Sequence, residues 1–183
     1  SNADKPWLYK DEQCVIDTLE SIQADVLISA SYGQKIPWET ISNAPRGGIN
    51  VHPSILPRWR GADPVPWAIL TGDHQIGVSI VTLSKTFDEG KMLAQKKIPL
   101  LPTDTSDPLR TKLFEMGANL LLKVLDKPTH VRKIINTNTT QTSSYARKFT
   151  RDDGFESWET LTGAMTDGTD AERIERKFRA LDL

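Results

Sequence analysis

Short apolar runs alternate along this chain with segments of helical periodicity, and this alternation constrains the fold more than any other feature. Residues 25–30 (Asp-Val-Leu-Ile-Ser-Ala) have the length and composition of a buried strand. Residues 48–51 and 78–83 have the same character, and residues 92–98 give a weaker strand pattern. Strands that alternate with helices predict an α/β protein with a largely parallel sheet.

The clearest helix pattern lies at residues 107–125, where apolar side chains form a stripe and Ser106 stands in the capping position. Residues 64–70 predict a helix whose two prolines are confined to its opening turn. Residues 11–23 and 171–183 carry further helical spacing. These helices separate the strand patterns, as an α/β fold requires.

Composition bounds the class of protein. An apolar fraction of 38% and a charged fraction of 26% describe a soluble globular chain. The net charge of −1 means that the basic surface which a nucleic acid requires is local or lies outside this chain. Cys14 is the single cysteine, and we interpret it as a buried, inert thiol in a reducing cytosol. No apolar run approaches the roughly 18 residues of a membrane helix.

The main candidate for chemistry is the segment in which the strand at 48–51 ends. Asn50 and His52 are two positions apart, so their side chains project to the same side of that strand. Pro53 and Pro57 then force the chain into a loop. Catalytic groups in open α/β sheets lie at such carboxyl ends of strands.

Asp88 follows the strand at 78–83 and adds a carboxylate to this amide and imidazole. The three groups suit acyl transfer through a tetrahedral intermediate, with a carboxylate to orient the histidine. A lone histidine after a strand is usually a structural residue whose hydrogen bonds are made within the protein. The hypothesis of catalysis therefore depends on the amide, imidazole and carboxylate occurring together. Asp73 and His74 are typical of a solvated turn and are not catalytic candidates. No cluster has the spacing of metal ligands, and we predict no metal.

The run Asn-x-His-x-Ser-x-Leu-Pro-x-x-x-Gly at 50–61, with Asp88 placed 36 positions after His52 (88 − 52), resembles the formyltransferases that use 10-formyltetrahydrofolate. Within that superfamily, residues 56–61 and 77–80 are most similar to methionyl-tRNA formyltransferases. The similarity covers residues from about 24 to 125 and from 145 to 183.

This resemblance implies a Rossmann-like catalytic domain and a defined reaction. A formyl group passes from 10-formyltetrahydrofolate to the amino group of methionyl initiator tRNA, for translation initiation. Asn50, His52 and Asp88 match the catalytic residues of the family. The folate is implied as a co-substrate, and a bacterial cytoplasm is the preferred location.

The same resemblance assigns two groups of binding residues. The segment that matches the folate-contacting part of the family is Ser54, Ile55, Leu56 and Pro57. The candidates for contact with the transfer RNA are Arg58, Trp59 and Arg60, because arginine pairs with phosphate and tryptophan stacks on unpaired bases. In the alternative interpretation, Arg60 pairs with an internal carboxylate and Trp59 packs in the protein. Asp63 departs from the small apolar residue that is common in the family.

The resemblance also predicts how the chain is divided. Residues 1–3 are interpreted as a cloning scar, 4–127 as the catalytic domain, 128–150 as a linker and 151–183 as the start of the tRNA-binding region. The N-terminal strands of the family's sheet and its C-terminal barrel are expected to lie outside this chain. We therefore expect the 183-residue chain to be inactive by itself and to self-associate through open strand edges.

Three alternatives remain open on the sequence alone. The first is a formyltransferase that acts on a sugar nucleotide or on glycinamide ribonucleotide. The second is a hydrolase that releases formate from the same folate. The third is a non-catalytic α/β binding module.

Overall fold

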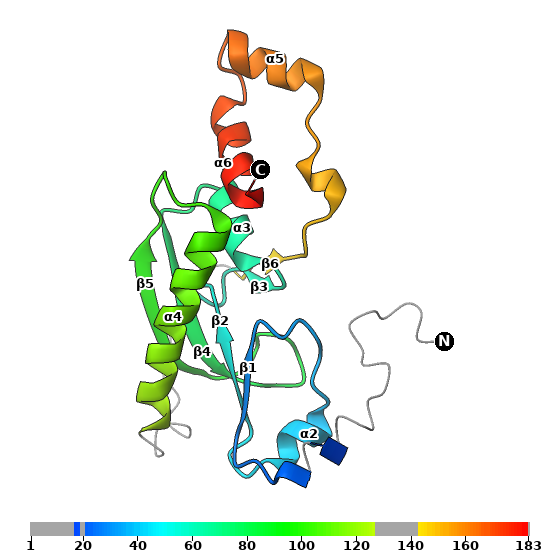
Figure 1. Cartoon of the computed structure of the whole chain (residues 1–183), viewed down its shortest axis with the longest axis vertical. Coiled ribbons are helices and arrows are strands. Elements are labelled where there is room, and N and C mark those ends of the chain that lie inside the picture. Colours follow the sequence, from blue (N-terminus) through cyan, green and yellow to red (C-terminus); the bar gives the residue numbers. More distant parts are fainter. Residues whose placement is uncertain (1–16, 19–20, 127–142, 183) are drawn as a thin grey trace, which may run out of the picture.

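The computed structural model describes residues 17–18, 21–126 and 143–182. Four strands form a sheet, α4 lies across one of its faces, and α5 and α6 extend beyond its end (Figure 1). The elements in chain order are β1 (Leu27–Ala30), α2 (Trp38–Asn43), β2 (Gly48–His52), β3 (Arg60–Gly61), α3 (Pro64–Leu70), β4 (Gln75–Thr82), β5 (Met92–Pro99), α4 (Ser106–Leu125), β6 (Tyr145–Ala146), the 3-10 helix η3 (Arg151–Gly154), α5 (Trp158–Thr166) and α6 (Ala171–Leu181).

The sheet has the strand order β1-β2-β4-β5, and its four strands are the four that the sequence predicts. The predicted α/β class is confirmed. The expected parallel pairing holds for β1 with β2, whereas β4 runs antiparallel to both β2 and β5, so the described sheet is mixed rather than largely parallel. The connections explain the difference. Residues 83–91 join β4 to β5 without a helix, and a direct connection of this kind returns the chain antiparallel.

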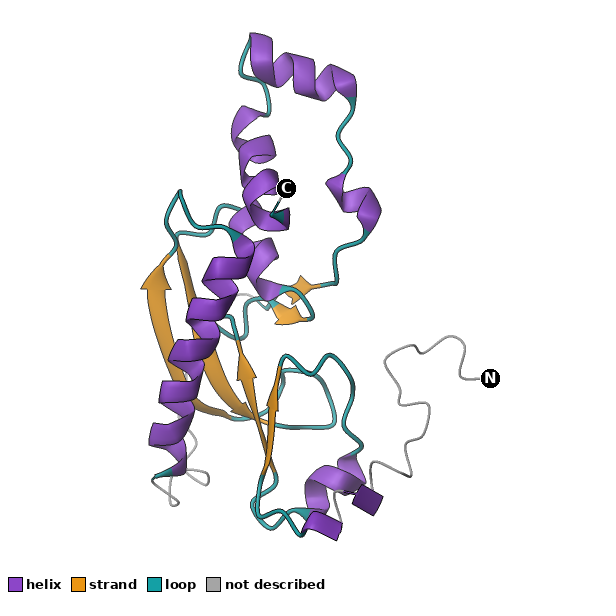
Figure 2. Ribbon diagram, viewed as in Figure 1, coloured by secondary structure: helices purple, strands orange, loops and turns teal. Residues whose placement is uncertain are grey.

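One core cluster lies between the sheet and α4, the long helix that lies over the strands in Figure 2. The close approach of the helix depends on Gly117, where a Cβ atom would lie 2.5 Å from Val51 Cγ1. The predicted helix is confirmed, but its cap is not Ser106. The capping position belongs to Thr105, and Ser106 is buried in the first turn, where Arg110 donates to its hydroxyl. The buried residues that fill this core are Ile49, Val51, Val78, Ile80, Leu93, Leu121 and Val124.

The C-terminal segment packs on the opposite end of the sheet from α2, as Figures 1 and 2 show. The two-residue strand β6 pairs in parallel with β3, and α6 packs against α3, where the buried Ala180 joins the core cluster of Val65, Ala68 and Ile69. The sequence predicts neither short strand, because two residues are too few to show a period. Part of the predicted linker therefore lies against the predicted catalytic domain. The proposed domain limits themselves stay predictions.

Two further predictions fall on parts of the chain that the structure does not describe. Most of the predicted helix at 11–23, including Cys14, lies outside the described residues. The same is true of residues 128–142 in the predicted linker.

Candidate active site

Three polar side chains meet at the carboxyl end of β2. Asn50 and His52 alternate with Val51 along this strand and so share one face. Asp88 belongs to the loop after β4, the neighbouring strand in the sheet. Its Oδ1 accepts a hydrogen bond from Asn50 Nδ2 at 3.2 Å and lies 3.5 Å from His52 Nδ1. The structure thus brings together the three residues that the sequence analysis selects as catalytic.

Asp88 is held in place by the backbone around it. Its second carboxylate oxygen accepts the backbone N–H of Gly61 at 2.8 Å, and its own φ is +55°, in the left-handed region. Two residues later the loop passes against β4 so closely that a Cβ atom on Gly90 would lie 1.6 Å from the Thr82 carbonyl oxygen. The Asp-x-Gly pattern therefore has a structural cause, since only glycine fits at this crossing.

His52 is almost completely buried, with 4% of its surface exposed. Its Nε2 lies 2.8 Å from the Trp59 carbonyl oxygen. A carbonyl oxygen can only accept, so Nε2 carries a hydrogen and donates it. In the neutral ring this leaves Nδ1 without a hydrogen, on the side of Asn50 and Asp88. Protonation of His52 would therefore add an N–H at Nδ1, on the side of the Asp88 carboxylate.

The segment 54–57, predicted to contact folate, is packed into the protein. Leu56 has 2% of its surface exposed, and Ile55 is also buried. The Leu56 N–H donates to Ser79 Oγ, and Gln95 Nε2 donates to the Leu56 carbonyl, both at 3.1 Å. Hence the backbone groups of Leu56 are already satisfied inside the protein. Pro57 is the more exposed end of this segment.

The three candidates for contact with transfer RNA have partners within the chain. Arg58 donates through Nε and Nη2 to both carboxylate oxygens of Asp73, at 2.7 and 2.5 Å. Arg60 Nη1 lies 2.8 Å from Glu89 Oε1. Trp59 has 8% of its surface exposed. These contacts are the ones that the alternative interpretation requires, with an internal carboxylate for Arg60 and a packed Trp59.

Asp73 differs from the solvated residue that the sequence predicts. It follows a turn as expected, but only 13% of its side chain is exposed. Its carboxylate accepts hydrogen bonds from Trp59 Nε1 at 2.7 Å and Thr71 Oγ1 at 3.1 Å, besides those from Arg58. Burial acts to raise the pKa of Asp73, but the hydrogen bonds from Arg58 and Trp59 outweigh it, and the pKa lies below its usual value. The local sequence could not reveal these partners, because packing of loop 58–59 against this turn supplies two of them.

The loop that carries Trp59 is also bound to the C-terminal segment. Ser144 Oγ accepts the Trp59 N–H at 2.9 Å, and the Ser144 carbonyl accepts the Arg60 N–H at 2.9 Å. Further along, Asp63 Oδ2 accepts the Phe149 N–H at 2.9 Å. Asp63 therefore holds the segment after β6. The sequence contains no local signal for the role of Ser144.

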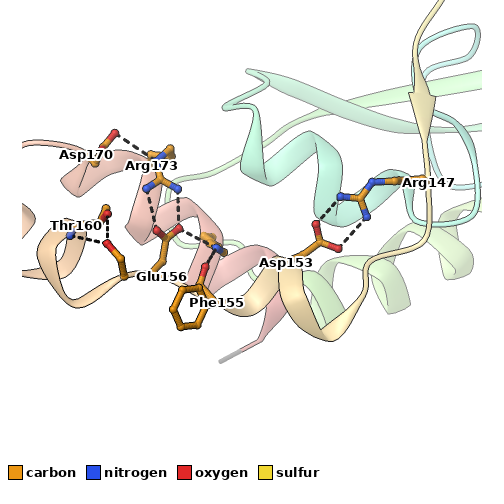
Figure 3. A network of polar contacts seen from close by, with 9 residues as sticks. Arg147, Asp153, Phe155, Glu156, Thr160, Asp170 and Arg173 are labelled. Carbon is orange, nitrogen blue, oxygen red and sulfur yellow. Dashed lines mark hydrogen bonds and ion pairs between the residues drawn. The ribbon is translucent and has the colours of Figure 1, made fainter.

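A separate polar network orders the segment from η3 to α6 (Figure 3). Asp153 forms a bidentate ion pair with Arg147. The hydrogen bonds from Arg147 keep the pKa of Asp153 well below its usual value. Glu156 accepts from Arg173 Nη1 at 2.6 Å and from Lys177 Nζ at 2.7 Å. Hydrogen bonds from Arg173, and then from Lys177, lower the pKa of Glu156 to about 2. This network joins the loop before α5 to α6.

Two cavities, of about 440 and 330 Å³, lie in the described part of the protein, and Asn50, His52 and Asp88 line neither of them. The smaller one lies beside Arg58, Trp59 and Asp73. Among the described residues there is no group of three or more histidine, cysteine, aspartate or glutamate side chains that could hold a metal ion. None of the described helices is long and apolar enough to span a membrane.

The fold and the cluster together define an α/β protein with a candidate acyl-transfer site at a strand end. Comparison with known families narrows this class. Residues 7–125 match the family described as Formyl transferase, and the chain belongs to that family. The match includes all ten residues that the sequence analysis selects.

Several relatives with a curated name are methionyl-tRNA formyltransferases. That of Buchnera aphidicola subsp. Schizaphis graminum is 37% identical over 165 residues, which make up 88% of this chain and 49% of the relative. That of Dictyoglomus thermophilum is 39% identical over 163 residues, or 89% of this chain and 49% of the relative. That of Roseiflexus sp. is 36% identical over 182 residues, or 97% of this chain and 51% of the relative. The chain spans about half the length of the curated relatives it matches.

Solved structures share the fold at lower identity. HypX from Aquifex aeolicus, in complex with tetrahydrofolic acid, superposes with a TM-score of 0.73 at 20% identity, covering 93% of this chain and 28% of HypX. A likely sugar N-formyltransferase from Mycobacterium tuberculosis, Rv3404c, gives a TM-score of 0.67 at 22% identity, covering 91% of this chain and 68% of that chain. At these identities the likeness concerns the fold alone.

Proposed function

We propose that this chain carries the reaction centre of an enzyme that transfers a formyl group from 10-formyltetrahydrofolate to the amino group of methionyl initiator tRNA. The reaction would serve translation initiation in a bacterial cytoplasm. The observation that carries the proposal is the convergence of Asn50 and His52 on one carboxylate oxygen of Asp88. Membership of the formyl transferase family and the names of the curated relatives support it.

In the proposed reaction the amine nitrogen attacks the formyl carbon, and a C–N bond forms while the carbonyl electrons move to oxygen. The resulting oxyanion needs hydrogen-bond donors. Asn50 has a second side-chain N–H besides the one that Asp88 accepts, and protonated His52 presents Nδ1–H on the same side. Collapse of the oxyanion breaks the bond from the formyl carbon to N10 of the folate, and N10 takes up a proton.

Proton balance is completed by Asp88. The attacking amine must lose one proton as the folate nitrogen gains one. The Asp88 carboxylate can accept the amine proton through water, and His52 can supply the proton for N10. Asp88 also fixes the side chain of Asn50, so one residue both orients the donor and relays the proton. The protein contributes mainly preformed orientation, because the formyl donor is already activated.

The residues proposed to contact the substrates are those that the sequence analysis assigns, with one change at Trp59. For the folate, the segment Ser54, Ile55, Leu56 and Pro57 is proposed to form a wall of its site, with the partly buried Pro57 as its least buried residue. For the transfer RNA, Arg58 and Arg60 remain the proposed contacts, since about a third of each side chain is exposed beside its carboxylate partner. Trp59 is better suited to hold the loop than to stack on a base.

Incubation of the whole protein with 10-formyltetrahydrofolate and each acceptor tests the proposal. The expected product is formyl-methionyl-tRNA, with little free formate. Formylation of an amino sugar nucleotide or of glycinamide ribonucleotide instead would assign the alternative formyltransferases, and release of formate without an acceptor would assign the hydrolase. A protein that binds the folate but yields no product would be a binding module. Each of these three outcomes contradicts the proposal.

A further inference from the structure

Asp73 lies outside the proposed catalytic cluster, yet it binds two consecutive residues of the loop next to it. Its Oδ2 accepts from Arg58 Nε at 2.7 Å and from Trp59 Nε1 at 2.7 Å, and its Oδ1 accepts from Arg58 Nη2 at 2.5 Å. Thr71 Oγ1 donates to Oδ1 at 3.1 Å. Both carboxylate oxygens are thus used, and most of the bonds run to the loop rather than to the turn that carries Asp73.

The loop residue that Asp73 holds has an unusual backbone conformation. Trp59 has a φ of +60°, which is rare for a bulky side chain and persists only where the surroundings enforce it. Three contacts enforce it here. Asp73 binds the indole N–H, Ser144 Oγ accepts the backbone N–H, and the indole stacks on Trp67 with ring centroids 5.9 Å apart. The conformation of Trp59 is therefore fixed from its side chain and from its backbone.

This conformation points the Trp59 carbonyl at His52. The carbonyl oxygen lies 2.8 Å from Nε2, whereas the Asp88 carboxylate lies 3.5 Å from Nδ1. Each acceptor favours a hydrogen on the nitrogen that it faces, and a neutral imidazole has only one. The shorter contact to Trp59 selects the Nε2–H tautomer. If the loop relaxed, Asp88 would draw the hydrogen to Nδ1 instead.

We propose that Asp73 is a positioning residue for the reaction: by holding Trp59 it keeps the Trp59 carbonyl against His52 Nε2 and so fixes the tautomer of the catalytic imidazole. The effect of Asp73 on the rate rests on the proposed function. The tautomer itself does not, because it is a property of the protein without substrate. These two consequences can be measured separately.

Nitrogen NMR of the full chain labelled with ¹⁵N-histidine tests the tautomer directly. The sequence has three histidines, His52, His74 and His130, so the signals are assigned by substitution. Above the titration of the imidazoles, His52 of the wild type should show the Nε2–H tautomer. Asp73→Ala removes both acceptor oxygens and should convert it largely to Nδ1–H. A folded Asp73→Ala protein with the wild-type tautomer would overturn the proposal.

Two further variants keep the test decisive. Glu156→Ala also removes a carboxylate that binds an arginine through two hydrogen bonds, but one that makes no contact with residues 58–59, and should leave the His52 tautomer unchanged. A shift in this control would mean that the tautomer responds to general loss of stability, which contradicts a specific role for Asp73. If Asp73→Ala fails to fold, Trp59→Phe removes the indole N–H donor and keeps an aromatic ring that can pack on Trp67. It should give a mixture of tautomers, and an unchanged spectrum would refute the link through Trp59.

The kinetic consequence is measured in the whole protein. Asp73→Ala should lower kcat by about 10- to 100-fold with little change in KM, because a small misplacement of a catalytic group has this cost. A structural role alone would lower the fraction of folded protein and leave the His52 tautomer of the remaining folded protein unchanged. If no formyl transfer occurs even in the wild type, the proposed function fails while the tautomer result stands.

Discussion

Phe149 donates its backbone N–H to the carboxylate of Asp63 at 2.9 Å, although 86 positions separate the two residues. Asp63 precedes α3 and lies two residues after β3, so this bond continues the pairing of β3 with β6. Trp67 of α3 adds to the contact. The ring centroids of Trp67 and Phe149 lie 4.9 Å apart, and Trp67 Nε1 donates to the Arg147 carbonyl at 2.9 Å. The C-terminal segment is therefore built onto the loop that also carries the contact to His52.

Replacement of Asp63 by alanine should weaken this attachment. The Phe149 N–H would lose its partner in a partly buried position, which costs about 1–3 kcal/mol of the free energy of unfolding. Urea denaturation of both proteins measures the difference. Asp63→Asn is the matched control, because its side-chain oxygen can still accept, and it should retain most of the stability. Equal losses in the two variants would show that the charge, not the hydrogen bond, matters.

Removal of any one member of the cluster should abolish most of the proposed activity. Asn50→Ala, His52→Ala and Asp88→Ala should each lower turnover of the whole protein by ~10²–10⁴-fold, since each removes a donor, an acid or an orienting base. Circular dichroism checks that each variant is folded. Asp88→Asn retains an acceptor for the Gly61 N–H and should preserve the loop while it loses the proton relay. Wild-type turnover in a folded Asp88→Ala protein would disprove the role of Asp88.

Gly90 should tolerate no side chain. A Cβ atom there would overlap the Thr82 carbonyl oxygen at 1.6 Å, and this atom belongs to the backbone of β4 and cannot rotate away. Gly90→Ala should therefore displace the loop that bears Asp88 and cost about 1–3 kcal/mol or more in thermal unfolding. Gly154→Ala serves as the control, because nothing lies within 4 Å of its added Cβ atom. An equal melting temperature for the two variants would contradict the geometry.

The Glu156 network should make stability depend on acid pH. The pKa of Glu156 is lowered from 4.5 to about 2 by Arg173 and Lys177. A lowered pKa in the folded state contributes stability that is present above the unfolded pKa and lost as the pH falls through the folded value. The difference in melting temperature between wild type and Glu156→Gln should therefore be constant above pH 4.5 and shrink toward pH 2. A difference that grows as the pH falls would have the wrong sign.

Local sequence patterns were sufficient to predict the strands of the sheet, helix α4 and the candidate catalytic residues. β2 is short and apolar, so its strand state, the shared side of Asn50 and His52, and its end at Pro53 all follow from neighbouring residues. The directions of the strands did not follow as well. Strand patterns do not specify a partner, and the antiparallel pairing of β4 depends on how residues 53–74 and 83–91 return the chain.

The sequence by itself determined the residue types that can perform acyl transfer and the strand that carries two of them. Only the tertiary structure decided how the loop at 58–61 is held. Asp73, Ser144 and Asp63 bind that loop or its continuation from distant positions, and no local pattern distinguishes such residues from solvated ones. The physical reason is that periodicity reports which side chains are buried within one element, whereas hydrogen-bond partners are chosen by the packing of separate elements. The tautomer of His52 belongs to this second kind of property, because the carbonyl that fixes it is placed by the loop.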